Sequence, residues 1–78
     1  MARLELYGTS SCPYTSEVRE SLEWQQQEFL EFDVEADPAA LERMLKLSGG
    51  QRSVPVLVQE GQVIQIGWQG RCCVVGST

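Results

Sequence analysis

The sequence predicts an α/β domain in which two helices pack on one mixed four-stranded sheet. Two kinds of segment follow one another along the chain. In one kind, apolar and polar residues alternate, as in a strand; in the other, apolar residues recur about every four positions, as in a helix. The resulting order is strand, helix, strand, helix, strand, strand. It implies a parallel βαβ unit followed by an antiparallel hairpin. With 78 residues, the chain is expected to form one domain, residues 1–78, with a small core.

The first half of the chain is predicted to form the βαβ unit. Leu4 and Leu6 lie on one face of an alternating segment, which is typical of a short strand. Pro13 suits the first position of a helix, and Ser10 or Ser11 precedes it as a candidate cap. The predicted elements are a strand over residues 3–7, a helix over residues 13–27 and a strand over residues 29–34.

The second half begins with a strong helix signal and ends without one. Asp37 is a typical N-cap followed by proline, and Gly49 ends the helix that starts there. The predicted elements are a helix over residues 38–48 and strands over residues 54–58 and 63–66, joined by a hairpin turn. The tail from Gly67 has three glycines in ten residues and no helical cap or period, so we expect it to be mobile.

Composition excludes several classes of function. The chain has 11 acidic and 6 basic residues, and this net charge of −5 argues against nucleic-acid binding. It has no histidine, which excludes Cys–His and Ser–His–Asp catalysis and any imidazole metal site. Its 3 cysteines cannot complete an all-cysteine zinc site. No segment resembles a membrane span or a secretory leader, so we expect a cytoplasmic protein with no membrane partner. We also expect a monomer with no bound metal.

Cys12 is the candidate reactive residue. It follows the first predicted strand and lies at the amino end of the first predicted helix. Free amides and the helix dipole stabilise an anion there, so the pKa of this thiol should fall and the thiolate should be favoured. The alternative is a buried, inert cysteine of the kind found in many small domains.

Three segments resemble the glutaredoxin family. Residues 7–14 (YGTSSCPY) are similar to its active-site segment, and residues 51–55 (QRSVP) are similar to its Thr-Val-Pro segment, with serine replacing threonine. Residues 67–70 (GWQG) resemble mycoredoxins and the redoxins that serve ribonucleotide reductase. The resemblance implies a minimal thioredoxin fold. The closing helix of the family is missing or very short, because only eight residues follow Gly70.

The resemblance also implies the residues of the site. Cys12 is the nucleophile, and Thr15 stands where dithiol members have a second cysteine, which gives a monothiol-type Cys-Pro-Tyr-Thr site. The Thr15 hydroxyl could favour the thiolate by a hydrogen bond, or Thr15 could be an ordinary residue of the first helical turn. The implied substrate-binding residues are Pro13, Tyr14, Gln51, Arg52, Val54, Pro55 and Trp68.

Some of these assignments have plain alternatives. Gln51 and Arg52 could be solvated loop residues, and Trp68 could fill the core instead of walling a groove beside Cys12. The family match implies a cis Val54–Pro55 bond that faces Cys12 and leaves Val54 free to pair with a substrate backbone. Without the match, Pro55 would mark an edge strand.

The leading function is glutaredoxin-like thiol–disulfide oxidoreduction, in which Cys12 attacks a disulfide-bearing or glutathionylated protein. Glutathione is a candidate co-substrate, and no tightly bound cofactor is expected. The family's usual glutathione-binding lysine and aspartate are absent near Thr9 and near Gln69 or Gly70. The alternatives are a glutathione-dependent iron–sulfur cluster carrier and a non-enzymatic binding module with a thioredoxin fold.

Cys72 and Cys73 are candidates for resolving a mixed disulfide on Cys12, because Thr15 cannot do so. The five residue-to-residue steps from Gly67 to Cys72 span at most about 18 Å, so the sequence leaves open whether Cys72 lies close to Cys12. One of the two cysteines could instead be a buried apolar filler, or the two could form a strained disulfide with each other.

Overall fold

The central strand of the sheet is flanked by strands from both halves of the chain. In the computed structural model, which describes residues 4–75, strand β1 (Leu4–Gly8) pairs in parallel with β2 (Phe29–Asp33) and antiparallel with β4 (Val56–Gln59). Strand β5 (Gln62–Ile66) then pairs antiparallel with β4, so the order across the sheet is β2-β1-β4-β5. The predicted mixed four-stranded sheet is confirmed. Arg3, placed in the first strand by the sequence, lies outside the described residues, as do residues 76–78 of the tail.

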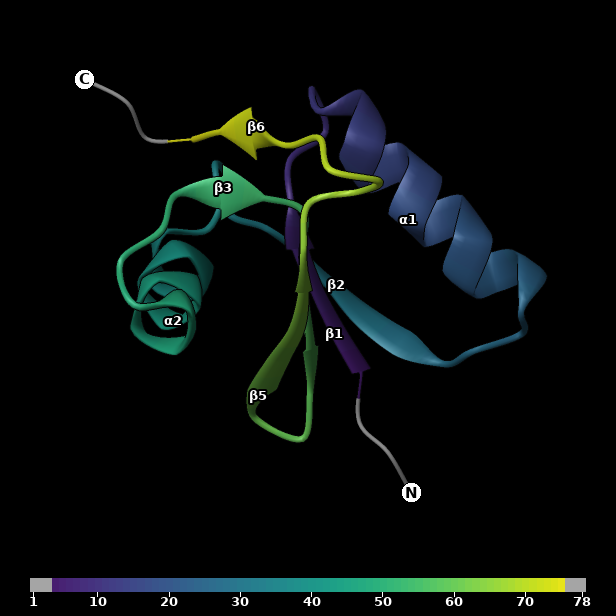
Figure 1. The fold of residues 1–78 in the computed structure, drawn as a ribbon. Helices are drawn as coiled ribbons and strands as arrows, with labels where there is room; N and C mark the ends of the chain where they lie inside the picture. The colour runs from purple at the N-terminus through teal and green to yellow at the C-terminus, as the bar shows by residue number, and fades with distance from the viewer. Residues whose placement is uncertain (1–3, 76–78) are drawn as a thin grey trace.

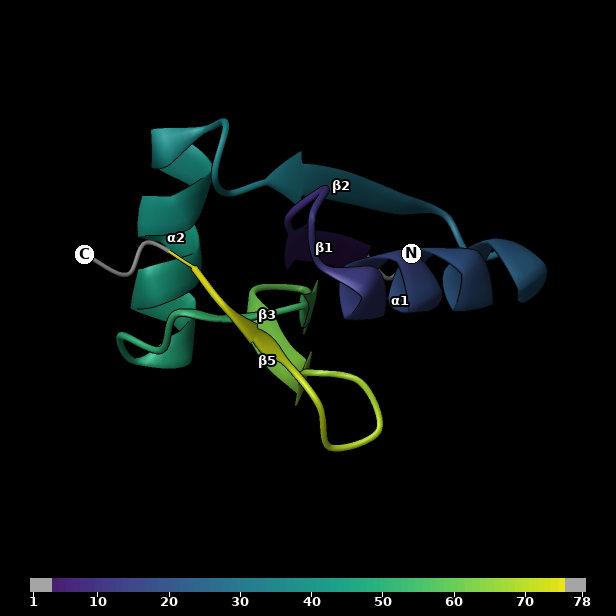
Figure 2. The ribbon, with the colours of Figure 1, turned by 90° about the horizontal axis from the view of Figure 1, so that it is seen from above.

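Two helices flank this sheet, α1 (Pro13–Trp24) and α2 (Pro38–Ser48) (Figure 1). Seen from above, they lie apart, with the strands between them (Figure 2). Both begin with proline, as predicted. Asp37 caps α2 by accepting hydrogen bonds from the amides of Ala39 and Ala40, and Gly49 ends it in the left-handed conformation that glycine favours. Helix α1 ends at Trp24, three residues earlier than predicted.

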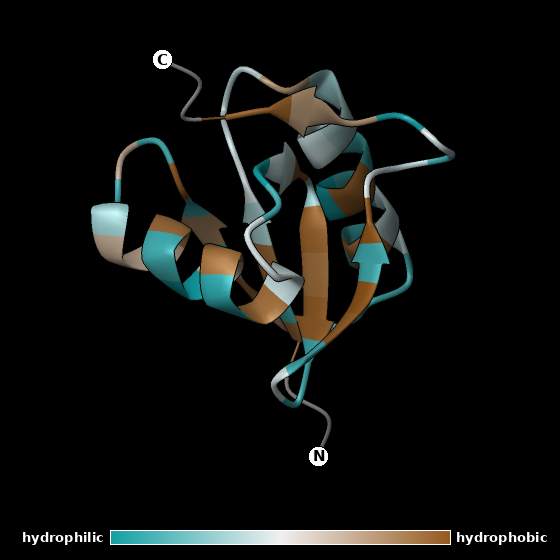
Figure 3. Cartoon of the chain, turned by 60° about the vertical axis from the view of Figure 1, so that its left-hand side comes forward, coloured by the Kyte–Doolittle hydropathy of each residue, from teal (hydrophilic) through white to brown (hydrophobic). Residues whose placement is uncertain are grey.

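The core is divided between the two faces of the sheet. On the α1 side, the buried residues are Leu4, Leu6, Val18, Leu22 and Leu57. On the α2 side, they are Tyr7, Cys12, Val34, Ala40, Met44, Val54, Val56, Val58 and Val75. Figure 3 shows a central strand coloured as hydrophobic, whereas the helices carry both hydrophobic and hydrophilic segments. No helix within residues 4–75 is long and apolar enough to cross a membrane.

The structure differs from the sequence prediction around Pro55. The single strand predicted over residues 54–58 is two strands, because β3 (Ser53–Val54) ends before Pro55 and β4 begins after it. Strand β3 belongs to a separate two-stranded sheet, where it pairs antiparallel with β6 (Cys73–Val74). The tail was expected to be mobile, but Cys73 and Val74 form this strand, and the next residue, Val75, is buried at 4% exposure.

Candidate active site

Cys12 is the residue from which α1 starts. It is the N-cap of the helix, with an extended backbone, and Pro13 follows at the first helical position. The expected serine cap is wrong: the capping position belongs to Cys12, and the described residues provide no side-chain cap there. The first-turn amides of α1 are therefore directed at the end of the helix that carries the Cys12 side chain. No acidic residue lies in this first turn to oppose a negative charge.

Cys12 is joined to Cys73 by a disulfide bond. The two residues are 61 positions apart in the sequence, and their Cα atoms are 6.1 Å apart, within the usual range for a disulfide. Cys12 is 1% exposed, and Cys73 is partly buried against the same cluster on the α2 side of the sheet. Of the two candidate resolving cysteines, the structure thus brings Cys73 to Cys12. Cys72 is exposed and free.

Strand pairing delivers Cys73 to this position. Cys73 pairs with Val54 and Val74 pairs with Ser53, and the amide of Val75 donates a hydrogen bond to the carbonyl of Arg52 at 2.8 Å. The Val54–Pro55 peptide bond is cis, as the family resemblance implied. Val54 and Cys12 lie in one buried cluster, so the short strand β3 and the start of α1 meet at the disulfide.

Thr15 lies one helical turn after Cys12 and is fully buried. Its hydroxyl oxygen has no hydrogen-bond partner among the described residues, so the predicted hydrogen bond to the Cys12 sulfur is not made in this disulfide form. The Thr15 side chain packs directly on Gly8 at the end of β1, where even a methyl group would overlap it. The close approach of α1 to β1 at the active site therefore requires glycine at position 8.

The other predicted substrate-binding residues differ in burial. Pro13 is exposed, and Tyr14 is partly buried against the cluster that contains Cys12. Gln51 and Arg52 are both exposed in the segment between α2 and β3. The backbone carbonyl of Gln51 accepts a hydrogen bond from the Ser48 hydroxyl at 3.0 Å, which ties this segment to the end of α2.

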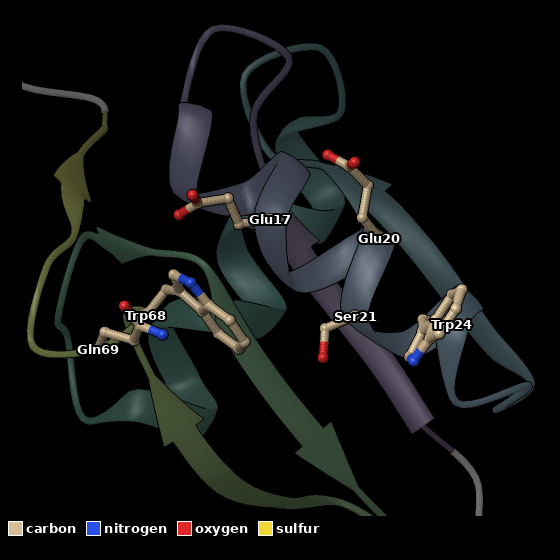
Figure 4. A pocket seen from close by; sticks show the side chains of 6 residues that line it. All are labelled: Glu17, Glu20, Ser21, Trp24, Trp68 and Gln69. Carbon is tan, nitrogen blue, oxygen red and sulfur yellow. The ribbon is translucent and has the colours of Figure 1, made fainter.

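Trp68 lines a groove along α1. The groove has a volume of about 560 Å³, and its lining residues are Glu17, Glu20, Ser21, Trp24, Trp68 and Gln69 (Figure 4). Cys12 is not among them, so this groove does not include the nucleophile. The indole also packs against the core cluster on the α1 side, which is the alternative that the sequence left open. Trp68 and Arg71 exchange two backbone hydrogen bonds, which close the turn that leads to β6.

Two polar groups near the site have defined partners. The Ser11 hydroxyl donates to the Glu35 carboxylate at 3.5 Å, one residue before the nucleophile. On the α2 side of the sheet, the Tyr7 hydroxyl donates to Glu5 and accepts from Arg43, and the Tyr7 ring stacks on Phe32. Burial raises the pKa of Tyr7, so the phenol stays neutral beyond its ordinary range.

The sequence did not reveal that β6 would exist. Two residues that follow a glycine-rich turn have no periodicity to detect, and Gly67 and Gly70 suggested only flexibility. A signal was present in the two adjacent valines, Val74 and Val75, because valine favours strands. In the structure Cys73 and Val75 turn inward and Val74 is 65% exposed.

The chain resembles known proteins over most of its length. The glutaredoxin family model matches residues 4–64. A solved structure of the thioredoxin-like protein BC3987 is 35% identical, with 85% of this chain and 88% of that chain covered and a TM-score of 0.74. A glutaredoxin from Archaeoglobus fulgidus is 26% identical over 88% of this chain and 78% of that chain, with a TM-score of 0.75. Glutaredoxin 1 from Francisella tularensis, at 19% identity, shares the fold, with a TM-score of 0.61 over 87% of this chain and 85% of that chain. The comparison with curated protein sequences found no match.

Proposed function

The chain belongs to the glutaredoxin family, and from this premise we propose that it is a thiol–disulfide oxidoreductase whose working pair is Cys12 and Cys73. The observation that carries the proposal is the disulfide between these two residues at the start of α1. The finer prediction of a monothiol-type site rested on Thr15, which occupies the place of the second cysteine in dithiol members. In the proposed cycle, β6 supplies the second cysteine instead.

The cycle has two exchange steps. The Cys12 thiolate attacks one sulfur of a substrate disulfide, so a bond forms between Cys12 and the substrate, the substrate disulfide breaks, and one substrate thiolate leaves. The Cys73 thiolate then attacks the Cys12 sulfur, which forms the Cys12–Cys73 disulfide and releases the second substrate thiolate. The leaving thiolates take protons from water. The substrate gains two electrons, and the chain loses two.

An external thiol reductant returns the chain to its reduced form by the reverse chemistry. Glutathione is the candidate reductant, and two molecules would be oxidised for each Cys12–Cys73 disulfide reduced. Arg52 supports this role because its side chain is exposed beside the edge strand β3 and can pair with a carboxylate. The proposed substrates are disulfide-bearing or glutathionylated proteins.

Mass spectrometry of the reduced chain after exposure to a small protein disulfide tests the proposal. The wild type should lose the mass of two hydrogen atoms, and a non-reducing digest should contain a Cys12–Cys73 linked peptide. Cys73→Ser should instead accumulate a stable mixed disulfide on Cys12. Cys72→Ser is the matched control, because it removes the neighbouring cysteine that is free and exposed, and it should behave as the wild type.

Two outcomes contradict the proposal in different ways. If Cys12→Ser still exchanges disulfides at the wild-type rate, Cys12 is not the nucleophile. If Cys73→Ser turns over unchanged with glutathione and no Cys12–Cys73 peptide forms in the wild type, the site is of the monothiol type, and Cys73 has no resolving role.

A further inference from the structure

The edge of β3 pairs with strand β6, and this pairing places Cys73 of β6 against Cys12. Within residues 4–75, β3 pairs only with β6. Cys73 lies opposite Val54 in this pairing, and the Cys73 sulfur is bonded to Cys12. Because Cys12 is 1% exposed, any sulfur that reaches it must belong to a segment placed closely against the site. The structure shows one segment placed in this way, and it is an extended strand.

The residues of this strand alternate between the core and solvent. Cys73 and Val75 turn toward the cluster that contains Cys12, Val54 and Met44, and Val75 is 4% exposed. Val74, between them, is 65% exposed. The β3 edge therefore accepts a cysteine, leaves the next side chain in solvent, and buries an apolar side chain at the position after that.

We infer that β6 occupies the edge to which substrates bind, as an intramolecular copy of a substrate segment. This inference rests on the proposed function and adds the substrate class to it. The preferred substrate is an extended segment with a disulfide cysteine at the position of Cys73 and a branched apolar residue two positions later, at the position of Val75. Backbone hydrogen bonds to residues 52–54 align the segment, and the buried side chain provides the selectivity.

Substrate and β6 cannot occupy the edge together, because one side of a strand pairs with one neighbour. In the oxidised chain, the bond to Cys12 holds β6 in place. Without this bond, the contacts that hold β6 among residues 4–75 are a two-residue strand, the Val75 amide hydrogen bond and the packing of the Cys73 and Val75 side chains, so a substrate segment can displace it. When the Cys12–Cys73 bond forms again, β6 returns to the edge and expels the substrate. The step that resolves the mixed disulfide on Cys12 therefore also releases the substrate.

Peptide substrates test this directly. The cognate peptide is Arg-Ser-Cys-Val-Val, which copies residues 71–75 with serine in place of Cys72 and carries nitrothiobenzoate on its cysteine as a mixed disulfide. Attack by the reduced chain at the peptide sulfur links the peptide to Cys12 and releases coloured nitrothiobenzoate. Two variant peptides carry aspartate, one at the position of Val75 and one at the position of Val74, so that their net charges are identical.

The second-order rate constant should fall about tenfold or more for aspartate at the buried position, relative to aspartate at the exposed position. Equal rate constants for the two aspartate peptides, each dependent on Cys12, would overturn the inference and leave the proposed function intact. If no peptide reacts faster with the wild type than with Cys12→Ser, the proposed function itself fails.

Variants of the full chain provide a second measurement. Val75→Asp should loosen β6, so that a mixed disulfide between Cys12 and the cognate peptide accumulates before the Cys12–Cys73 bond forms. Val74→Asp adds the same charge at the exposed neighbouring position and should not cause this accumulation. Accumulation to the same level in both variants would show that Val75 does not hold β6 on the edge.

Discussion

Reduction of the Cys12–Cys73 disulfide is expected to lower the free energy of unfolding by about 4 kcal/mol. The bond joins residues 61 positions apart, and a crosslink that closes a loop of this length removes about 14 cal/mol/K of entropy from the unfolded chain. A domain of 78 residues is typically stable by about 4–12 kcal/mol in total. The disulfide thus accounts for a large share of the stability of the oxidised chain.

Urea denaturation of the oxidised and reduced chain, followed by circular dichroism, measures this difference. With an m-value of about 1–2 kcal/mol/M, the midpoint should fall by roughly 2 M or more on reduction. The oxidised chain should also have the smaller m-value, because the crosslink keeps its unfolded state more compact. Cys73→Ser should match the reduced wild type with or without reductant.

Cys72→Ser is the matched control, because Cys72 is exposed and free. It should retain the full difference between oxidised and reduced forms. The reasoning is refuted if reductant leaves the midpoint of the wild type unchanged, or if Cys72→Ser abolishes the difference while Cys73→Ser keeps it.

Three further predictions concern the reduced site and the core. Cys12 in the reduced chain should have a pKa below about 8.5, because the α1 amino terminus stabilises the thiolate, and iodoacetamide alkylation against pH measures it. Thr15→Val should raise that pKa by about one unit if the buried, unpartnered hydroxyl turns to the thiolate on reduction; an unchanged alkylation profile would exclude this role. Burial raises the pKa of Tyr7 above its unfolded value of about 10, so its contribution to stability is full below pH 10 and is lost as pH rises through the folded pKa. Tyr7→Phe should therefore flatten the decline of unfolding free energy above about pH 10, and an unaltered slope would contradict this.

Local chemistry made most of the fold predictable. Asp37 followed by proline has one common use, the start of a helix, and Gly49 suits the left-handed turn that ends it. Pro13 marked the start of α1 for the same reason, since its missing amide hydrogen has no helical partner to lose. These signals depend on neighbouring residues alone, so they can be recognised without knowledge of the tertiary structure.

It was harder to predict which faces of each strand are buried. Alternation with Leu4 and Leu6 places Tyr7 on the opposite face of the first strand, but β1 is central in the sheet and both of its faces are covered, so Tyr7 is fully buried. Strand β2, by contrast, is an edge strand, and its apolar residue Leu30 is 48% exposed. Position within the sheet decides these cases, and alternation alone does not encode it.

The position of the second working cysteine also depends on tertiary structure. Thr15 stands where a second cysteine would lie one turn after Cys12, but the residue that meets Cys12 comes from the opposite end of the chain. Cys72 and Cys73 were equivalent candidates until the register of β6 against β3 was known. A shift of one residue in that register would turn Cys73 outward and Cys72 inward.

Because the second cysteine, Cys73, lies on β6 and not in α1, oxidation has a different structural effect. A disulfide between Cys12 and a cysteine at position 15 would link two residues of one helical turn and leave the rest of the surface unaltered. The Cys12–Cys73 bond instead fixes β6 along β3, where a substrate strand would pair, and adds the buried side chain of Val75 to the core. Under the proposed cycle, the oxidised chain is therefore both the more stable form and the form with its substrate edge occupied. In that cycle, reduction removes the bond that holds β6 on the edge and lowers stability in a single step, so the redox state of Cys12 determines when a substrate segment can displace β6.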